Sequence, residues 1–303
     1  MTENETGLVS VIIPTYNRGH CLARALKSVL DQTYVNWEAI IVDNHSTDNT
    51  DEVLARFEDT RIKAFKIHNR GVIAASRNAG ILEAKGEWIA FLDSDDWWLP
   101  LKLDVSVKAL EGGEDLVYHD LYVFYENKNK KSKLKKLKTR DLVSPVFDDL
   151  LLNGNAINNS SVIVKKSILE KAGNISVDRD LIAAEDYDTW LRISKITNKF
   201  KRLRGCYGYY SQGSDNLSNS ERKERNILRL GEIYCLNNEY IYPVWMNYSL
   251  ARLYSKNQNF KKSKQYALNV IKKMPSPKVF VKSVITYFFA VWQLKIFARG
   301  NGT

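Results

Sequence analysis

Three aspartates within four positions follow an apolar run in the segment FLDSDDWWLP, residues 91–100. Asp93, Asp95 and Asp96 carry like charges, and such charges raise one another's pKa unless a cation joins them. Mg²⁺ and Mn²⁺ take carboxylate and phosphate oxygens together and keep several waters. An Asp-x-Asp pair at the tip of a strand is therefore suited to hold a metal ion against a nucleotide diphosphate. The alternative is a surface turn or a helix N-cap, which stays open for Asp96 in particular.

A second group of acids opens a predicted helix in AAEDYDTWLRI, residues 183–193. Glu185, Asp186 and Asp188 stand in its first turn, where the helix dipole favours negative charge, so a purely structural role is the alternative. Arg192 lies four positions after Asp188, which is the spacing of an ion pair on one helix face. That pairing predicts a structural Asp188 and leaves Asp186 free for chemistry.

Residues 8–125 alternate regularly between strand and helix patterns. β-Branched apolar runs at 8–16, 37–44, 62–67, 87–95 and 115–125 predict strands, and helical spacing predicts helices at 21–33, 47–57 and 71–86. Strands buried on both faces and separated by helices indicate a parallel, doubly wound sheet. In such sheets ligands bind outside the carboxyl ends of the strands, which is where Asp93 and Asp95 fall.

The pattern loosens after residue 125. The run NKNKKSKLKKLKTR, residues 127–140, is basic, and we interpret it as a solvated hairpin or loop in preference to an anion site. Residues 160–173 predict a strand that leads into a helix, and residues 201–211 predict a strand on the sheet edge.

The excess positive charge belongs to the C-terminal segment. The chain carries a net charge of +10, yet the last acid is Glu239 and eleven Lys and Arg follow it. Residues 246–275 resemble one tetratricopeptide-like helix pair, although any helical hairpin gives the same spacing. Residues 279–300 are strongly apolar, with only twelve residues between Lys282 and Lys295, which is short of the ~20 that a spanning helix needs. We therefore predict an interfacial helix that contacts anionic headgroups. Its expected apolar face is Phe280, Val284, Phe288, Val291 and Trp292, and the alternative is a helix docked on the protein's own core.

Composition limits the class of protein. The chain is 44% hydrophobic and 26% charged, as in ordinary globular proteins. Three cysteines at long spacings fit a reducing compartment, and the N-terminus lacks the pattern of a secretory signal, so we expect a cytoplasmic protein. The basic tail lacks the aromatic and glycine pattern of a base-reading module, which argues against nucleic acid as a partner.

Four segments in this order resemble a family 2 glycosyltransferase of the kind that builds bacterial polysaccharides or glycans. They are VSVIIPTYNR, LKSVLDQTYVNWEAIIVDNHSTDNT, ASRNAGILEAKGEWIAFLDSDDWWLP and EDYDTWLR, and the resemblance runs from about residue 8 to about residue 195. It implies the GT-A fold, an α/β nucleotide-diphospho-sugar transferase fold with a doubly wound, mainly parallel sheet, here followed by a C-terminal helical extension. It also implies inversion at the anomeric carbon. We expect a catalytic domain over 1–220, with a nucleotide-sugar half at about 8–125 and an acceptor half at about 126–220, and a basic helical region over 221–303.

The resemblance assigns the base pocket to the ends of the first two strands. Thr15 and Tyr16 would line the pocket, with Tyr16 against the face of the base. Asp43 and Asn44 end the second strand, where many family members have two aspartates and the second hydrogen-bonds the uracil imide. The carbonyl of Asn44 can still accept from N3–H, so a pyrimidine base fits, and both UDP and dTDP stay open.

The remaining roles follow from the same resemblance. Arg77 would approach the diphosphate, Asp93 and Ser94 would lie near the ribose, and Asp95 would bind Mn²⁺ or Mg²⁺. In the loop after the predicted edge strand, where relatives often carry a His or Ser that closes over the diphosphate, Gln212, Ser214 or Asn216 would serve. The catalytic base would be Asp186, with Glu185 beside it orienting the acceptor. Trp97 and Trp98 could each stack on a sugar or fill the core; we assign Trp98 to the acceptor.

The sequence thus predicts a metal-assisted inverting glycosyltransferase. The expected donor is a UDP-sugar that supplies a hexose or N-acetylhexosamine, and the expected acceptor is a lipid-linked or polysaccharide hydroxyl at the inner face of the cytoplasmic membrane. A nucleotide-dependent oxidoreductase is disfavoured, because IPTYNRGH stands where G-x-G-x-x-G would follow the first strand. The alternative is a non-catalytic scaffold built on a transferase domain, and the presence of both Asp95 and Asp186 argues against it.

Overall fold

The computed structural model describes residues 7–125, 135–212, 220–236, 238 and 241–300, with side chains up to residue 296. The chain falls into two units. One comprises Met1–Phe147 and Ala156–Asn216, and the other comprises Asp148–Asn155 and Leu217–Thr303. The expected domain boundary at residue 220 stays a prediction; residues 148–155 group with the C-terminal helices.

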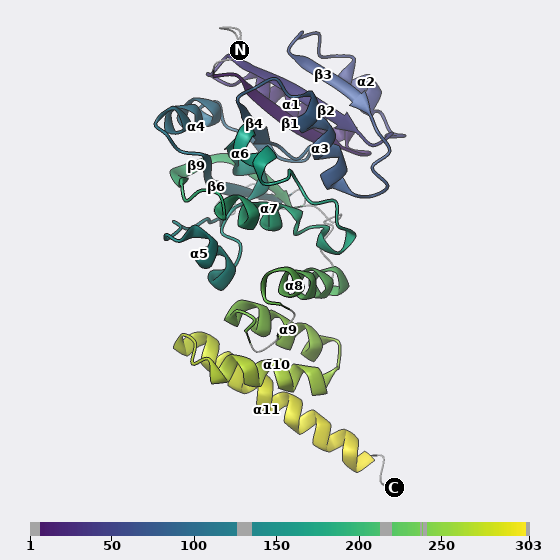
Figure 1. Ribbon diagram of the computed structural model, residues 1–303. Helices are drawn as coiled ribbons and strands as arrows, with labels where there is room; N and C mark the ends of the chain where they lie inside the picture. The colour runs from purple at the N-terminus through teal and green to yellow at the C-terminus, as the bar shows by residue number, and fades with distance from the viewer. Residues whose placement is uncertain (1–6, 126–134, 213–219, 237, 239–240, 301–303) are drawn as a thin grey trace. The chain divides into compact units, whose positions relative to one another are not determined.

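The first unit is built on one mixed sheet, which is nine-stranded within the described residues (Figure 1). Its order is β3-β2-β1-β4-β8-β6-β9-β5, and β7 pairs with β6. β3, β2, β1 and β4 run parallel to one another, as do β6 and β9, while β8 is antiparallel to β4 and β6. The bounds are β1 (Val9–Thr15), β2 (Trp37–Asp43), β3 (Ile62–Lys66), β4 (Trp88–Phe91), β5 (Trp97–Trp98), β6 (Leu116–Tyr125), β7 (Lys135–Leu137), β8 (Ile163–Lys165) and β9 (Phe200–Gln212).

Helices follow most strands, as the alternating pattern predicts. They are α1 (Gly19–Leu30), α2 (Thr50–Leu54), α3 (Ile73–Glu83), α4 (Lys102–Glu111), α6 (Lys166–Lys171) and α7 (Glu185–Ser194), with 3₁₀ turns η2 (Asn159–Ser161) and η3 (Arg179–Leu181). α3 lies close to the sheet at Gly80, because a Cβ there would stand 2.7 Å from the side chain of Ile12. The mainly parallel, doubly wound architecture is confirmed.

The parallel register brings the candidate residues to one edge of the sheet. Thr15 lies opposite Asp43, and Asp43 lies opposite Lys66. On the other side of β1, Ile12 lies opposite Phe91, so the chain leaves β4 toward Asp93 near the same edge. Strand ends of successive parallel strands meet at one edge, and this is the physical basis of the site described below.

Of two further sequence-based expectations, one needs adjustment and the other fits the structure. The predicted edge strand at 201–211 is β9, which has β6 on one side and the two-residue β5 on the other. Residues 135–137 of the basic run form β7, which makes an antiparallel pair with β6 and so fits the hairpin interpretation. Residues 126–134 of that run lie outside the described part of the chain.

The second unit is helical. It contains most of α5 (Val146–Asn153) together with α8 (Ser220–Tyr234), α9 (Val244–Lys256), α10 (Phe260–Lys272) and α11 (Pro277–Gly300). α9 and α10 form the expected helical pair: the Ser263 hydroxyl donates to the Ala251 carbonyl at 3.0 Å, and the rings of Tyr254 and Tyr266 stack at 5.5 Å. Its core residues include Met246, Leu250, Ala251, Tyr254, Phe260, Tyr266 and Val270.

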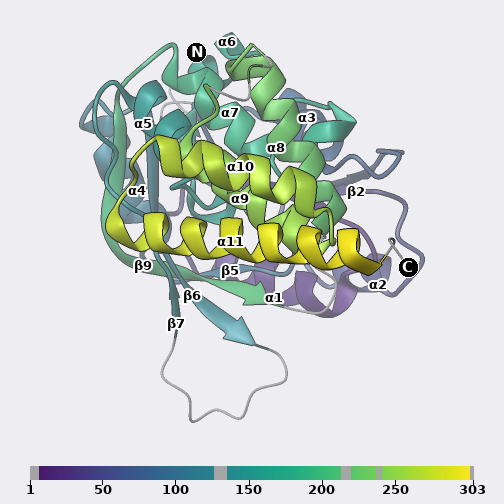
Figure 2. The same ribbon diagram turned by 90° about the horizontal axis from the view of Figure 1, so that it is seen from below.

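α11 packs along α10 in the second unit (Figure 2). Ser283 and Ala290 are buried, and the ring of Phe289 meets that of Phe260 edge to face at 5.9 Å. Pro277–Ile296 is the one segment of the described residues long and apolar enough to cross a membrane, and only 11% of its apolar window is buried. Small side chains thus make the close contact with α10, and most of the large apolar ones stay exposed.

Candidate active site

The end of β1 carries a buried hydroxyl without a partner. Thr15 is buried, and its Oγ1 has no hydrogen-bond partner within the described residues. Buried polar groups are normally paired, so such a group is a candidate for ligand contact. Tyr16 follows at once and its side chain is 53% exposed, as a residue that stacks on a base requires before the ligand binds.

Asp43 organises the loops at the end of β2. Its carboxylate is buried and accepts from the backbone N–H of Ser46 at 3.1 Å and from the Ser46 hydroxyl at 2.5 Å. Ser46 in turn accepts from the backbone N–H of Asn17, and the Asn17 side chain accepts from the N–H of Thr47. The loops after β1 and β2 are therefore held together around Asp43.

Asn44 has one of its acceptor sites already in use. Its Oδ1 accepts from the backbone N–H of Asn69 at 2.8 Å, which ties the end of β2 to the loop after β3. An amide oxygen has two lone pairs, so a second acceptor site and the Nδ2 donors remain. The contact of Asn44 with a pyrimidine base stays a prediction.

The burial pattern explains the run of acids after β4. Asp93 and Asp95 are partly exposed, whereas Ser94 and Asp96 are buried. Asp93 and Asp95 are therefore the two acids of this segment that a ligand can reach. The backbone N–H of Asp96 donates to the Asp93 carbonyl at 3.0 Å and closes the turn. We call residues 93–96 the acidic turn.

Asp95 has the features of a metal ligand. Burial and the neighbouring Asp93 charge raise the pKa of Asp95, while Arg18 and Arg24 act in the opposite direction. Among the described residues, none besides Asp95 itself donates to its carboxylate, and no group of three or more His, Cys, Asp or Glu in that part of the chain could hold a metal alone. One or two carboxylates plus phosphate oxygens is the usual way that Mg²⁺ is held with a nucleotide, and Asp95 fits that donor set.

Arg77 joins the acidic turn to α7. Its side chain is buried, with Nη2 2.7 Å from Oδ1 of Asp93 and Nη1 2.6 Å from Oε1 of Glu185. Burial alone would lower the pKa of Arg77, but the two carboxylates raise it above its ordinary value. Arg77 therefore fixes the distance between these two acids, and its predicted approach to the diphosphate stays untested.

The acids in the first turn of α7 have different partners, as their spacing indicates. Asp188 pairs with Arg192 at 2.8 Å, so the structural ion pair is confirmed. Glu185 uses Oε1 for Arg77, and its Oε2 is buried without a partner within the described residues, which leaves it available for an acceptor hydroxyl. Asp186 accepts from the backbone N–H of Tyr187 at 2.7 Å. Burial and the adjacent Glu185 charge raise the pKa of Asp186 to about 7, a value suited to a base at neutral pH.

Three further residues surround the acids and were missed by the sequence reasoning. The Asn159 side chain donates to Asp93 at 3.2 Å, and the Ser160 hydroxyl accepts from the Asp93 backbone N–H at 3.2 Å. Burial and the charges of the acidic turn raise the pKa of Tyr210 to about 12, so its hydroxyl lies within electrostatic reach of that turn. The polar run NNSS at 158–161, directly before a strand, was the available signal.

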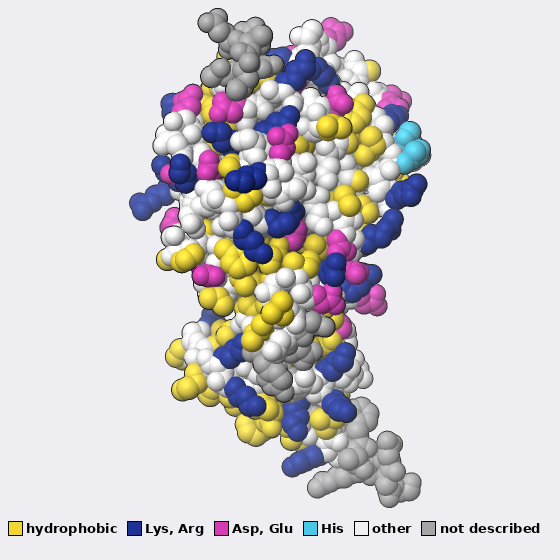
Figure 3. All heavy atoms as spheres, in the orientation of Figure 1, with side chains coloured by type: hydrophobic (Ala, Val, Ile, Leu, Met, Phe, Trp, Pro, Cys, Tyr) yellow, Lys and Arg dark blue, Asp and Glu magenta, His cyan; other side chains and the backbone are white. Residues whose placement is uncertain are grey.

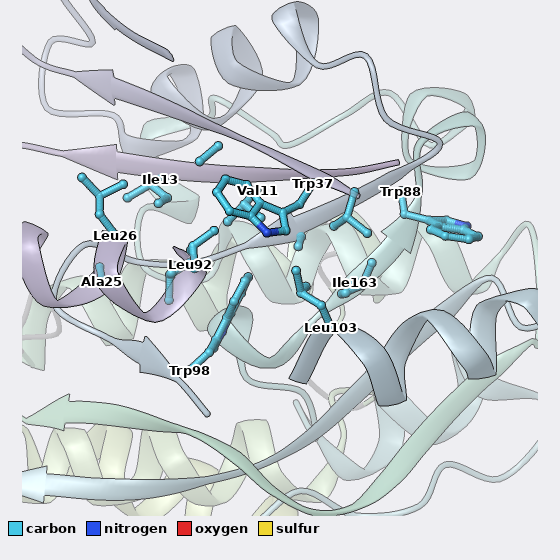
Figure 4. Close-up of a cluster of buried hydrophobic side chains, with 14 of the residues drawn as sticks. Val11, Ile13, Ala25, Leu26, Trp37, Trp88, Leu92, Trp98, Leu103 and Ile163 are labelled. Carbon is cyan, nitrogen blue, oxygen red and sulfur yellow. The ribbon is translucent and has the colours of Figure 1, made fainter. Parts of the chain in front are cut away.

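The acceptor role assigned to Trp98 does not fit its environment. Its side chain is 3% exposed and lies in the core among Leu92, Leu103 and their neighbours (Figure 4). Its Nε1–H donates to the Ser160 carbonyl at 2.8 Å, so its polar end is satisfied as well. Trp98 is therefore a core residue. Trp97 is partly exposed and has the Arg24 guanidinium over its ring at 3.7 Å.

The loop after β9 is described only at its start. Gln212 ends β9 and is exposed. Ser214 and Asn216, the other candidates for contact with the diphosphate, lie outside the described residues.

Comparisons with known proteins agree with this geometry. Residues 10–171, more than half of the chain, match the family described as Glycosyl transferase family 2. The UDP-Glc:alpha-D-GlcNAc-diphosphoundecaprenol beta-1,3-glucosyltransferase WfgD of Escherichia coli is 34% identical over 194 residues, which cover 63% of this chain and 71% of WfgD.

Two solved structures share the fold. S. aureus TarS 1–349 in complex with UDP-GlcNAc has a TM-score of 0.61 at 15% identity and covers 95% of this chain and 91% of that one. The mannosyltransferase PcManGT from Pyrobaculum calidifontis, in complex with GDP-Man and Mn²⁺, has a TM-score of 0.52 at 16% identity and covers 97% of this chain and 79% of that one. This chain belongs to glycosyl transferase family 2 and is an inverting glycosyltransferase with the GT-A fold.

Proposed function

We propose that this enzyme transfers a hexose or N-acetylhexosamine from a UDP-sugar to a hydroxyl of a lipid-linked or polysaccharide acceptor. One observation carries the proposal: Asp186, whose pKa is raised to about 7, sits next to Glu185, which Arg77 connects to Asp93 of the acidic turn. A proton acceptor and a candidate metal-diphosphate site are thereby held in one rigid arrangement.

The donor is bound at the carboxyl ends of β1, β2 and β4. The unpartnered Thr15 hydroxyl, the exposed Tyr16 ring and the Asn44 side chain face the base, and Asp93 and Ser94 lie toward the ribose. UDP is the preferred nucleotide because the relative WfgD is named for UDP-Glc and TarS was solved with UDP-GlcNAc. Asn44 in place of the common aspartate leaves dTDP as the second candidate.

Asp95 would hold Mn²⁺ or Mg²⁺ against the diphosphate. When bound, such an ion neutralises the negative charge that develops on the leaving diphosphate. Arg18 and Arg24 act electrostatically on Asp95 and supply positive charge near the proposed position of the diphosphate. PcManGT, which shares the fold, was solved with Mn²⁺.

Asp186 acts as the base. Its carboxylate takes the proton from the acceptor hydroxyl while that oxygen attacks the anomeric carbon of the donor. The bond from the anomeric carbon to the diphosphate oxygen breaks, its electron pair leaves with the diphosphate, and the configuration inverts because attack and departure are on opposite sides. The free oxygen of Glu185 orients the acceptor hydroxyl.

α11 contacts the membrane surface in this proposal. Its exposed side chains form a stripe that differs from the predicted face: Val284 and Val291 are partly buried, and the stripe is Val281, Ile285, Phe288, Trp292 and Ile296. Exposed Lys278, Lys282 and Lys295 accompany it. The view in Figure 3 shows hydrophobic and basic side chains gathered over the C-terminal helices. Apolar residues flanked by lysines suit an anionic bilayer surface.

Because α10 packs along α11, we favour an α11 that lies on the membrane surface over one that crosses the membrane. α10 packs along α11 and exposes Lys261, Lys262 and Lys272. A spanning α11 would carry these lysines into hydrocarbon, where charged groups are costly. An enzyme docked in this way meets acceptors on undecaprenyl-type lipids at the membrane surface, which is the acceptor class in the name of WfgD.

The function is tested by donor binding and turnover on the purified chain. UDP-, dTDP- and GDP-sugars are screened with and without Mn²⁺ or Mg²⁺, for the wild type, Asp95→Ala and Asp186→Asn. We expect one donor to bind in a metal-dependent manner that Asp95→Ala abolishes. Asp186→Asn should bind that donor normally and lose turnover by roughly 10²–10⁴-fold, as a missing general base does.

The alternative of a non-catalytic scaffold predicts a different result. In that case no nucleotide sugar would bind under any metal condition, and Asp186→Asn would be silent. The buried, unpartnered atoms at Thr15 and Glu185 favour the enzyme, because a site without a ligand has no reason to retain them.

A further inference from the structure

The third acid of the acidic turn, Asp96, is buried, whereas Asp93 and Asp95 are partly exposed. It is 1% exposed, and its Oδ1 accepts from the backbone N–H of Ser211 at 2.8 Å. Ser211 lies near the end of β9, 115 positions further along the chain. Asp96 therefore does not reach the ligand; it connects the acidic turn to a distant strand.

Ser160 completes the connection from the other side. Its hydroxyl accepts from the Asp93 backbone N–H at 3.2 Å and lies close enough to the Asp96 carboxyl to act against the rise in the pKa of Asp96. Its carbonyl accepts from Nε1–H of Trp98 at 2.8 Å, which fixes η2 against the core. Ser160 therefore anchors the first residue of the acidic turn and lies beside the last.

Asp95 itself has little to hold it in place. Within the described residues no other side chain donates to its carboxylate. Its carbonyl accepts from Nη2 of Arg24 at 3.0 Å, and the Arg24 guanidinium stacks on Trp97. The direction of the Asp95 side chain is consequently set by the backbone of the acidic turn, and that backbone is set by its anchors.

We propose that Asp96 is a positioning residue that fixes the direction of Asp95 by tying the acidic turn, beside Ser160 of η2, to Ser211 of β9. It touches neither metal nor substrate and acts through Asp95. The inference rests on the proposed function, in which Asp95 is the metal ligand. Residues that orient a metal ligand typically affect metal affinity about 10–100-fold when removed.

The test measures Mn²⁺ binding directly, by the electron paramagnetic resonance signal of free Mn²⁺, on the full chain with UDP present. Asp96→Ala should weaken Mn²⁺ binding by about tenfold. Asp96→Asn should stay close to wild type, because the amide oxygen still accepts from the Ser211 N–H. UDP binding without metal, measured by calorimetry, should be unchanged in both variants. Asp104→Asn, on a partly exposed α4 carboxylate that pairs with Lys108, is the matched control.

The outcomes separate this inference from the proposed function. Asp95→Ala in the same assay should abolish Mn²⁺ binding with UDP; if it does not, the metal site itself is wrong. If Asp95→Ala abolishes binding but Asp96→Ala leaves it within twofold of wild type, the positioning role is overturned. Should Asp96→Ala fail to fold, Ser160→Ala decides the question, because it removes the hydroxyl that anchors Asp93 and lies beside Asp96, with a smaller change. Unaltered Mn²⁺ affinity in Ser160→Ala would then overturn the proposal.

Discussion

Nη1 of Arg77 lies 2.6 Å from Oε1 of Glu185, although 108 positions separate the two residues. The same guanidinium binds Asp93 through Nη2, so a single buried cation spans the acidic turn and the first turn of α7. Carboxylates around a buried arginine depend on it for compensation of their charge. Arg77 therefore both positions the two carboxylates and stabilises the fold by compensating their charge.

Replacing Arg77 by methionine should destabilise the fold strongly. Breaking a buried ion pair by removing one partner costs about 3–5 kcal/mol, because uncompensated charge is left behind. The free energy of unfolding, from urea titration of the wild type and Arg77→Met, checks this. Arg204→Met, at an exposed position on β9, is the control and should change stability by less than about 0.5 kcal/mol. A stable Arg77→Met protein that merely loses UDP affinity would instead support direct contact with the diphosphate.

The turnover number should depend on pH through Asp186. The pKa of Asp186 is raised to about 7 by burial and then by the Glu185 charge, and the base works only when deprotonated. kcat should thus rise with pH through about 7 and level off above it. Removing the Glu185 charge with Glu185→Gln takes away a cause of the elevation, so the midpoint should move to lower pH. A pH–kcat profile at saturating donor and acceptor measures both, and an unchanged midpoint in Glu185→Gln would contradict the coupling.

The same elevated pKa has a consequence for stability, with a definite sign. The folded state holds the Asp186 proton up to about pH 7, whereas the unfolded state releases it near the ordinary aspartate pKa of 3.8. Between these values the folded state binds more protons, so this group's contribution to stability is full below the unfolded pKa and is lost as pH rises toward 7. Asp186→Asn has no titrating carboxyl at this position, so its stability does not fall in this way as pH rises. Unfolding titrations at pH 5 and pH 8 should show a larger gain for Asp186→Asn at pH 8, and an equal gain at both would contradict the assignment.

Trp98→Ala should behave as a core mutation. Truncating a buried tryptophan typically costs about 3–5 kcal/mol, and this one also supplies a hydrogen bond to Ser160. Trp98→Phe keeps most of the packing and should lose less. The free energies of unfolding of the wild type, Trp98→Phe and Trp98→Ala should decrease in that order, and urea titration measures them. If Trp98 contacted the acceptor, its variants would raise the acceptor KM while stability stayed near wild type.

Removing two side chains of the α11 stripe should detach the enzyme from membranes. Phe288→Ser with Trp292→Ser is expected to lower affinity for vesicles rich in phosphatidylglycerol by tenfold or more, since roughly 1.4 kcal/mol is already tenfold and each buried aromatic contributes about that or more. Vesicle co-sedimentation measures this, with Leu82→Ser on α3 as the exposed apolar control. Phosphatidylcholine vesicles should bind more weakly than anionic ones. Binding that survives high salt and alkaline extraction would indicate a spanning helix instead.

The sequence allowed the sheet and much of the site to be predicted, for a specific physical reason. Parallel strands align their carboxyl ends, so polar residues at the ends of β1, β2 and β4 had to meet. The ion pair between Asp188 and Arg192 could be predicted equally well, because residues four positions apart lie on the same face of a helix. In both cases the contact follows from the regular geometry of a parallel sheet or of a helix.

What the sequence did not reveal are contacts between residues far apart in the chain. The Arg77–Glu185 and Asp96–Ser211 pairs join elements whose spacing carries no periodic signal. The two tryptophans after the acidic turn could not be told apart, because they lie beyond the strand whose alternation would have assigned their sides. The exposed face of α11 differs from the predicted face because the small residues Ser283 and Ala290 lie on the buried side of the helix.

The tie between Asp96 and Ser211 also bears on how the protein is made. Apart from the candidates in the loop after β9, the residues assigned to the nucleotide lie before position 96, yet the turn that carries Asp95 is anchored by a serine at 160 and a strand that ends at 212. During synthesis the parallel half of the sheet emerges first and can pair locally, while β9 must wait for contacts of long sequence separation, which form slowly. The acidic turn is therefore completed late in folding. A growing or truncated chain that lacks β9 would carry the nucleotide residues without a finished catalytic site, so sugar transfer is withheld until most of the fold exists.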